Sequence, residues 1–144
     1  MHRIEVHLKS QLPDARGAGL AKDIRDLGID TVSDARVVDV YWLDADLAPD
    51  ELDLICRGLL ADPVTHRYSS DSSVSTADHV IEVARNPGVS DPVEETVAKA
   101  IGDLGISGVR EVRMARRYLL DGTVNDRQLA EITAKLLVNP IIEH

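Results

Sequence analysis

The sequence predicts an α+β fold built from two β-α-β-α-β halves that form an intramolecular pseudo-dimer. Three observations predict it: an internal duplication, alternating apolar and polar residues typical of strands, and apolar residues at helical spacing between those strands. A shift of 77 residues aligns residues 2–67 with 79–144 without a gap, and about a third of the aligned residues are identical. The length of this match indicates a duplicated unit. We therefore divide the chain into repeat 1 (residues 1–67), a Ser- and Asp-rich connector (68–78) and repeat 2 (79–144).

Each repeat opens with a half-buried strand. Residues 4–9 read IEVHLK, in which apolar and polar side chains alternate. Ile81, Glu82 and Val83 repeat the start of that pattern. Alternation with a period of two residues predicts a strand with one face in the core.

The first helix of each repeat follows a loop. In repeat 2, Asp91 is predicted as the N-cap, with Pro92 at the first helical position and Glu94 as the third residue of a capping box. Apolar residues recur every three or four positions along both helices, at 20, 24 and 27 and at 97, 101 and 104. A glycine that can adopt a left-handed conformation follows each helix, Gly28 or Gly105.

A long extended segment and a second helix complete each repeat. Residues 32–44 and 109–121 are rich in β-branched and aromatic side chains, and their apolar positions fall on both sides, as in a strand that is covered on both faces or bent between two sheets. The second helix begins at Pro49 or after Asn125, which Gln128 follows as in a capping box. Residues 63–68 and 140–144 then predict short closing strands. We expect the halves to bury a sheet face against each other around a pseudo-twofold axis and to share one core.

Composition excludes several classes of partner. The formal net charge is −9, the pI is near 4.9, and no stripe of Lys or Arg is present, so we expect no nucleic-acid or membrane partner. The sequence shows no signal peptide and no long apolar run, and we expect a cytoplasmic protein. Cys56 has no second cysteine to pair with. Its spacing from Leu52 and Leu59 indicates a small core residue, with a reactive thiol as the alternative.

Motifs for catalysis or metal binding are missing from the sequence. The five histidines form no HxxxH or HxH pair, and neither nucleophile-elbow nor phosphate-loop spacing occurs. Asp44 and Asp46 imitate a pair of catalytic carboxylates, but both border a turn and we interpret them as solvated loop charges. We expect no metal site, no bound cofactor and no catalytic residues.

The most basic local cluster is Arg113, Arg116 and Arg117, next to Tyr118. The interpretation that we favour is a solvated strand edge, because exposed ion pairs contribute little. The alternatives are a docking surface or a pair across the axis. Arg116 is the equivalent of Asp39, so a pseudo-twofold axis would bring these two charges together.

The motifs of repeat 2 resemble a known family. Over residues 80–143, the stretches GVSDP, DLGI, VREVR, YLLDG and KLLVNPIIE are similar to the PurS subunit of phosphoribosylformylglycinamidine (FGAM) synthase. Repeat 1 matches more loosely through DARG, DLGI, RVVDVY and LLADPV. The tandem arrangement resembles the N-terminal region of the long, fused synthase, or a free-standing double-length PurS.

The resemblance implies a ferredoxin-like α+β fold and an accessory role in purine biosynthesis. Proteins of this family bridge the synthetase component (PurL) and the glutaminase component (PurQ), so that ammonia from glutamine reaches the ATP-activated substrate. The resemblance also implies that the assembled enzyme uses ATP, Mg²⁺ and glutamine, and that this chain binds none of them. Further self-association stays open. The residues expected to bind partners are Gly88, Asp91, Pro92, Arg113, Arg116, Arg117, Tyr118, Asn139 and Pro140.

Repeat 1 and repeat 2 depart from the family pattern at different points. The glycine of the family's DPxG motif is kept as Gly17 in repeat 1, where the proline is missing, and is Glu94 in repeat 2. An alternative function is a small-molecule-binding regulatory domain of the ACT type, since ferredoxin-like pairs also bind effectors at their pseudo-twofold interface. A pocket at the junction of the halves, lined by the DARG or GVSDP segment, would favour that alternative.

Overall fold

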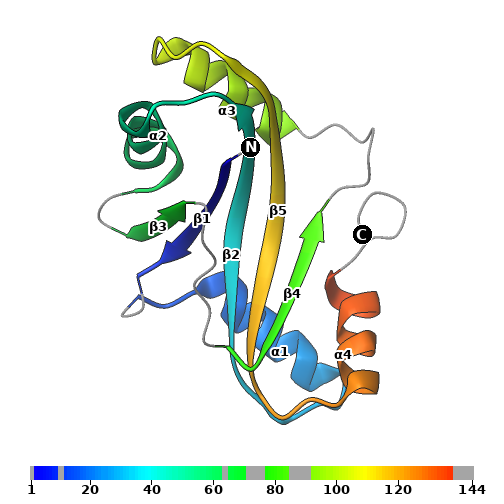
Figure 1. Ribbon diagram of the computed structural model, residues 1–144. Helices are drawn as coiled ribbons and strands as arrows, with labels where there is room; N and C mark the ends of the chain where they lie inside the picture. Colours follow the sequence, from blue (N-terminus) through cyan, green and yellow to red (C-terminus); the bar gives the residue numbers. More distant parts are fainter. Residues whose placement is uncertain (1, 10–11, 63–64, 71–76, 85–91, 138–144) are drawn as a thin grey trace.

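The chain folds as two β-α-β units joined through one sheet (Figure 1). The computed structural model describes residues 2–9, 12–62, 65–70, 77–84 and 92–137. The elements of the first half are β1 (His2–Leu8), α1 (Ala15–Asp26), β2 (Val32–Ala45), α2 (Pro49–Ile55), the π-helix η1 (Cys56–Leu60) and β3 (His66–Ser70). Those of the second half are β4 (His79–Ala84), α3 (Pro92–Asp103), β5 (Val109–Gly122), α4 (Asp126–Ile132) and the π-helix η2 (Thr133–Leu137).

The sheet is antiparallel throughout, with the strand order β3-β1-β2-β5-β4. The two halves meet where β2 pairs with β5, and Asp39 lies opposite Arg116 in that register. These two residues are equivalent under the 77-residue shift, so the pseudo-twofold axis passes between them. The predicted intramolecular pseudo-dimer is confirmed. The expectation that the halves bury sheet faces against each other is wrong, because they join edge to edge and thereby pair the backbone groups of both long strands.

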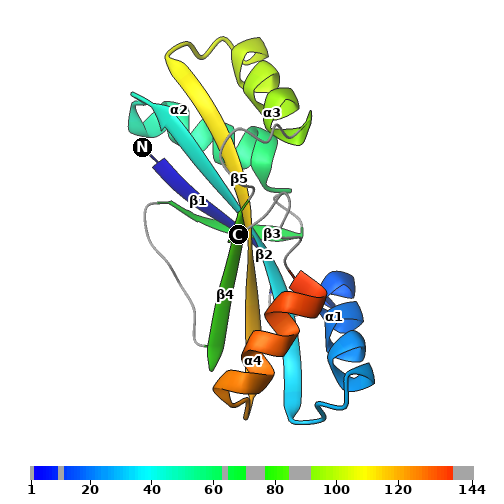
Figure 2. The same ribbon diagram turned by 90° about the vertical axis from the view of Figure 1, so that its right-hand side faces the viewer.

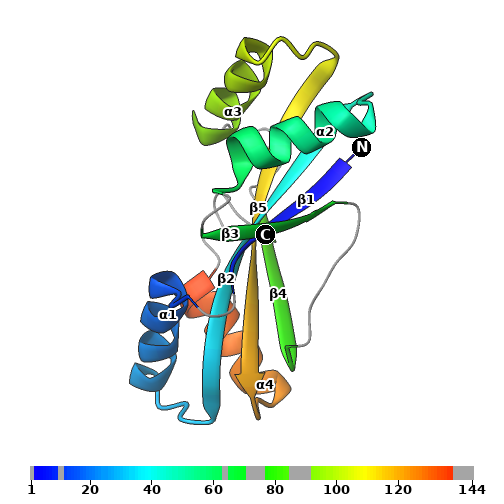
Figure 3. The same cartoon turned by 90° about the vertical axis from the view of Figure 1, so that its left-hand side faces the viewer.

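Two hydrophobic cores flank the axis, and both halves contribute to each. Helices α1 and α4 lie beside one end of the β2–β5 ribbon, and α2 and α3 lie beside the other (Figures 2 and 3). Ile24 and Ile132 meet in the first core, whereas Ile55 and Ile101 meet in the second, and all four are fully buried. The single shared core expected from the sequence is therefore wrong. Strands of 14 residues are long enough to carry a separate helix pair at each end.

In each half, an acidic side chain accepts a hydrogen bond from a backbone amide of the long strand, just beyond the residues that pair with the first strand. In the first half, Asp14 caps α1 by accepting a hydrogen bond from Gly17 N, and its other oxygen accepts from Val37 N of β2 at 2.9 Å. In the second half, Glu94 accepts from Met114 N at 2.7 Å, and Met114 is the equivalent of Val37. The Glu94 carboxylate thus binds a strand amide, where the sequence predicted a capping-box role. Its predicted N-cap partner, Asp91, lies outside the described residues.

Gly17 allows α1 to lie against β2. A Cβ atom at this position would come within 2.0 Å of the backbone oxygen of Ala35. No side chain fits there without moving the helix, so the glycine retained in repeat 1 is required by packing.

Several predicted helix ends are present. Asn125 accepts a hydrogen bond from Gln128 N at 2.8 Å, and the Gln128 side chain accepts from Asn125 N at 3.1 Å, which is the predicted capping box. Gly28 and Gly105 follow the first helices with φ values of +90° and +81°. The π-helices at the ends of both second helices are not anticipated by the sequence pattern, and Cys56 at the start of η1 is fully buried, as expected for a core residue.

The closing strands differ in how far the structure describes them. Strand β3 overlaps the first predicted closing strand at residues 66–68 and continues to Ser70, which places its last residues in the predicted connector. The second predicted closing strand, residues 140–144, lies outside the described residues.

Candidate functional site

Charged side chains from both halves meet at the pseudo-twofold axis. Asp39 accepts hydrogen bonds from both terminal nitrogens of Arg16 on α1, each at 3.1 Å, and these bonds raise the pKa of Arg16. Opposite Asp39, the guanidinium group of Arg116 lies over the ring of Tyr118, 5.8 Å from its centroid. The register thus brings Asp39 and Arg116 together, as the duplication predicts, while the two side-chain bonds of Asp39 go to Arg16.

Only part of the arginine cluster of β5 lies at a strand edge. Strand β5 sits between β2 and β4, and β4 pairs with residues 115–120, so the solvated-edge interpretation is wrong for Arg116 and Arg117. Arg113 lies beyond the residues that pair with β4 and is partly exposed. Neighbouring residues of a strand point to opposite faces. Arg116 therefore faces the helices together with Tyr118, and Arg117 faces the other side of the sheet.

Arg117 belongs to an ion network that ties the two halves together. It lies 3.3 Å from Glu5 of β1, whose side chain is only 1% exposed, and the other oxygen of Glu5 accepts from Arg3 at 2.6 Å. Arg3 also binds Glu82 of β4 and lies 5.3 Å from the ring centroid of Trp42. Arg117 of repeat 2 thus contacts Glu5 of repeat 1, and Arg3 of repeat 1 contacts the equivalent Glu82 of repeat 2, so the network connects the two repeats twice.

His7 is buried beside that network. Its Nε2 atom lies 3.8 Å from Glu5 and has no hydrogen-bond partner among the described residues. Burial lowers the pKa of His7, with Arg67 and Arg117 acting in the same direction and Glu5 opposing them. The imidazole is therefore neutral near pH 7.

Two of the other predicted partner-binding residues, Arg113 and Pro92, lie in the part of the chain that the structure describes. Arg113 is partly exposed and lies 3.9 Å from Glu94 and 3.8 Å from Glu111. Pro92 is exposed and begins α3. Four of the predicted residues lie outside the described part of the chain: Gly88, Asp91, Asn139 and Pro140. Their role in partner binding stays a prediction.

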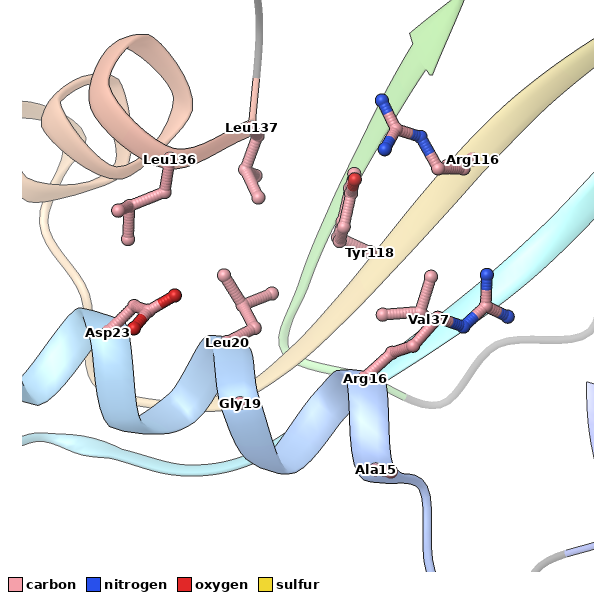
Figure 4. Close-up of a pocket in the computed structure, with 10 residues that line it drawn as sticks. All are labelled: Ala15, Arg16, Gly19, Leu20, Asp23, Val37, Arg116, Tyr118, Leu136 and Leu137. Atoms are coloured by element: carbon pink, nitrogen blue, oxygen red, sulfur yellow. The ribbon is translucent and has the colours of Figure 1, made fainter.

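A pocket of about 360 Å³ opens on the helix-bearing face, next to the axis (Figure 4). Its wall is formed by α1, β2 and β5 and by the end of η2, so both halves contribute. The side chains that shape it include Arg16, Leu20, Asp23, Arg116, Tyr118 and Leu136. Sequence reasoning singled out Arg116 and Tyr118 and named the DARG segment, which supplies Ala15 and Arg16, but it missed Asp23 and Leu136. The sequence did contain a signal for Asp23: repeat 2 has Ala100 at the equivalent position, so the acidic side chain is specific to repeat 1.

Other candidate chemistry is weak in the described part of the chain. No group of three or more His, Cys, Asp or Glu side chains there is arranged to hold a metal ion. Arg110 lies 3.0 Å from Asp44 and 3.6 Å from Asp46, whose side chain is 96% exposed, as expected for solvated charges beside a turn. Within the same residues, no helix is long and apolar enough to cross a membrane.

Comparison with known proteins identifies the family. The family model for PurS, described as phosphoribosylformylglycinamidine (FGAM) synthase, matches residues 1–73 and again residues 78–144. The chain is also similar to the phosphoribosylformylglycinamidine synthase subunit PurS of Mycobacterium leprae (strain TN), with 39% identity over 66 residues. That alignment covers 44% of this chain and 84% of the relative, so the relative corresponds in length to about one repeat. The chain therefore belongs to the PurS family and consists of two PurS units in tandem.

Proposed function

We propose that this chain is a non-catalytic accessory subunit of FGAM synthase that works in the cytoplasm, in purine biosynthesis. In this role it joins the synthetase and glutaminase components, so that ammonia released from glutamine reaches the activated substrate. The observation that carries the proposal is the double family match on a fold in which β2 and β5 join both units into one sheet. ATP, Mg²⁺ and glutamine are used by the partners in this proposal, and the chain itself binds no cofactor.

The charged groups at the junction support a structural role. Glu5 is buried between Arg3 and Arg117, and Asp39 is held by Arg16. In this proposal these contacts hold strands β1, β2 and β5 and helix α1 together.

The two ends of the ribbon present different surfaces, as a bridge between two different proteins requires. Leu54, Val93 and Leu104, which are 44%, 50% and 39% exposed, belong to α2 and α3 or directly follow α3. On the other side of the axis lies the charged pocket beside α1 and η2. We assign one partner to each end, with the apolar end as one docking surface, because exposed apolar side chains concentrate at protein interfaces.

Sedimentation velocity with purified synthetase and glutaminase components tests this proposal. In the presence of ATP, Mg²⁺ and glutamine we expect one complex that contains all three proteins. Leu54→Glu, an exposed substitution, should weaken association with one partner and leave the other unchanged. The matched control is Arg57→Glu, one turn away on the same helical segment. No complex with either component would overturn the proposal, and equal loss of both partners would overturn the assignment of one partner to each end.

The pocket at the junction is the observation that favours the regulatory alternative. It is lined by Ala15 and Arg16 of the DARG segment, as that alternative required. A ligand site is compatible with an accessory subunit of the PurS family, so the pocket adds to the proposed role without replacing it.

A further inference from the structure

The pocket has a basic end and an acidic end with an apolar wall between them. Arg16 and Arg116 lie at one end, and Asp23 lies two helical turns further along α1 (Figure 4). Leu20 stands between the two ends on the helix, and the leucines at the end of η2 face it. This arrangement matches an elongated ligand with an anionic group at one end and a hydrogen-bond donor at the other.

The duplication supplies an internal comparison for these side chains. The apolar and aromatic residues of the pocket are kept in the other half: Leu20, Tyr118, Leu136 and Leu137 correspond to Val97, Tyr41, Leu59 and Leu60. All three charged residues are replaced there: Arg16, Arg116 and Asp23 correspond to Val93, Asp39 and Ala100. The equivalent positions of the other half therefore do not carry this set of charges. Arg16 is engaged with Asp39 at the axis, whereas Asp23 and Arg116 lie at the two ends of the pocket, and this asymmetry points to binding.

The length of the pocket selects the ligand. Arg16 and Asp23 are seven residues apart on α1, which corresponds to about 10 Å along the helix. An inorganic anion reaches one end only, and the α-carboxylate and α-ammonium groups of an amino acid lie too close together to reach both. We propose that the pocket binds a nucleoside monophosphate whose base carries an exocyclic amino group. The volume of about 360 Å³ lies within the range of roughly 300 to 1,000 Å³ that small-molecule pockets occupy.

Each end has a defined task in this proposal. The planar guanidinium group of Arg116 binds the phosphate, since arginine presents two parallel N–H donors to such an anion. Arg16 stands at the same end, and its two bonds to Asp39 fix its orientation before a ligand arrives. Asp23 accepts a hydrogen bond from the exocyclic amine, while the base packs between Leu20 and Leu136.

Titration calorimetry with adenosine monophosphate and the full chain tests the site, at fixed ionic strength. Arg116→Gln should weaken binding by about tenfold or more, because it removes a charged hydrogen-bond donor. The matched control is Arg110→Gln, which makes the same change in charge near the start of the same strand, where Arg110 binds Asp44 away from the pocket. We expect unchanged affinity in this control, and circular dichroism checks that both variants are folded.

Asp23→Asn tests the acidic end through an exposed position, so its effect does not depend on the fold. The wild-type protein should prefer adenosine monophosphate to inosine monophosphate, which carries an oxygen in place of the amine. The variant should lose that preference. The proposal is overturned if adenosine monophosphate does not bind, if Arg116→Gln binds it as tightly as the wild type, or if phosphate or adenosine alone binds equally well. An equal affinity of the wild type for both nucleotides would overturn the assignment of Asp23. None of these readouts depends on the synthase complex, so the site and the proposed accessory role fail separately.

Discussion

Replacing Gly17 by alanine tests the packing of α1 on β2. The new Cβ would lie 2.0 Å from the Ala35 backbone oxygen, so the helix has to move away from the strand by about 1.5 Å to restore contact distance. That movement overpacks the junction, at a cost of about 1–3 kcal/mol. It also stretches the Asp14 bond to Val37 N, a charged hydrogen bond worth about 1.5–3 kcal/mol. In the opposite direction, the higher helix propensity of alanine relative to glycine stabilises the protein by about 0.5–1 kcal/mol.

The net expectation is that Gly17→Ala lowers the free energy of unfolding by about 2–4 kcal/mol. The matched control lies two residues further along the same helix: a Cβ at the exposed Gly19 meets nothing within 4 Å. Gly19→Ala should therefore stabilise the protein by about 0.5–1 kcal/mol. Urea unfolding followed by circular dichroism measures both variants. Shifts of the two midpoints in the same direction would refute the packing argument.

Three further predictions concern the ion network, its histidine and a helix cap. Arg117→Ala should lower the free energy of unfolding by about 3 kcal/mol because it leaves a buried carboxylate with one partner fewer. Arg113 is partly exposed, so Arg113→Ala should cost less than about 1 kcal/mol. Equal losses in urea unfolding would contradict the stabilising role of the ion network. Burial lowers the pKa of His7 below 6.5, so unfolding takes up a proton as the pH falls through 6.5 toward the lower folded value, and stability is lost there. His7→Gln should therefore reduce the change of the thermal midpoint with pH between about pH 7 and 5. An unchanged pH dependence would exclude His7 as its source. Asn125→Ala should cost about 1 kcal/mol in urea unfolding through the lost cap, and no loss would show that the cap contributes nothing.

Much of the fold could be predicted because the duplication constrains it. Each helix start and strand appears twice in the sequence, so a weak signal in one repeat is strengthened by the other. The Asn125 capping box and the glycines after the first helices are examples of local chemistry that sequence alone specifies. The pairing of Asp39 opposite Arg116 also follows from symmetry, since equivalent residues meet at the axis of an antiparallel pair.

The errors arose where a local pattern does not determine long-range pairing. The composition of the second long strand is the same for an edge strand and a central one, so it did not reveal that β4 would cover β5. The strand pattern alone likewise did not decide between packing face to face and pairing edge to edge. Glu94 was assigned to a helix cap from its spacing, but its side chain reaches the Met114 amide of a strand that begins 15 residues later in the chain.

The candidate pocket was only partly predictable. Arg116 and Tyr118 stood out because they belong to the most basic local cluster of an acidic chain. Asp23 and Leu136 resemble ordinary exposed and amphipathic helix residues, and only the crossing of α1 with the end of η2 brings them together. That crossing joins helices of different repeats, which periodicity within one repeat does not describe.

The measurement that tests the accessory role most directly is the rate of formylglycinamidine ribonucleotide formation by the synthetase and glutaminase components, with and without this chain. The account predicts that turnover with glutamine requires the chain, while turnover with free ammonia does not. Equal rates with glutamine in its presence and absence would contradict the proposed role and leave the tandem PurS fold in need of another function.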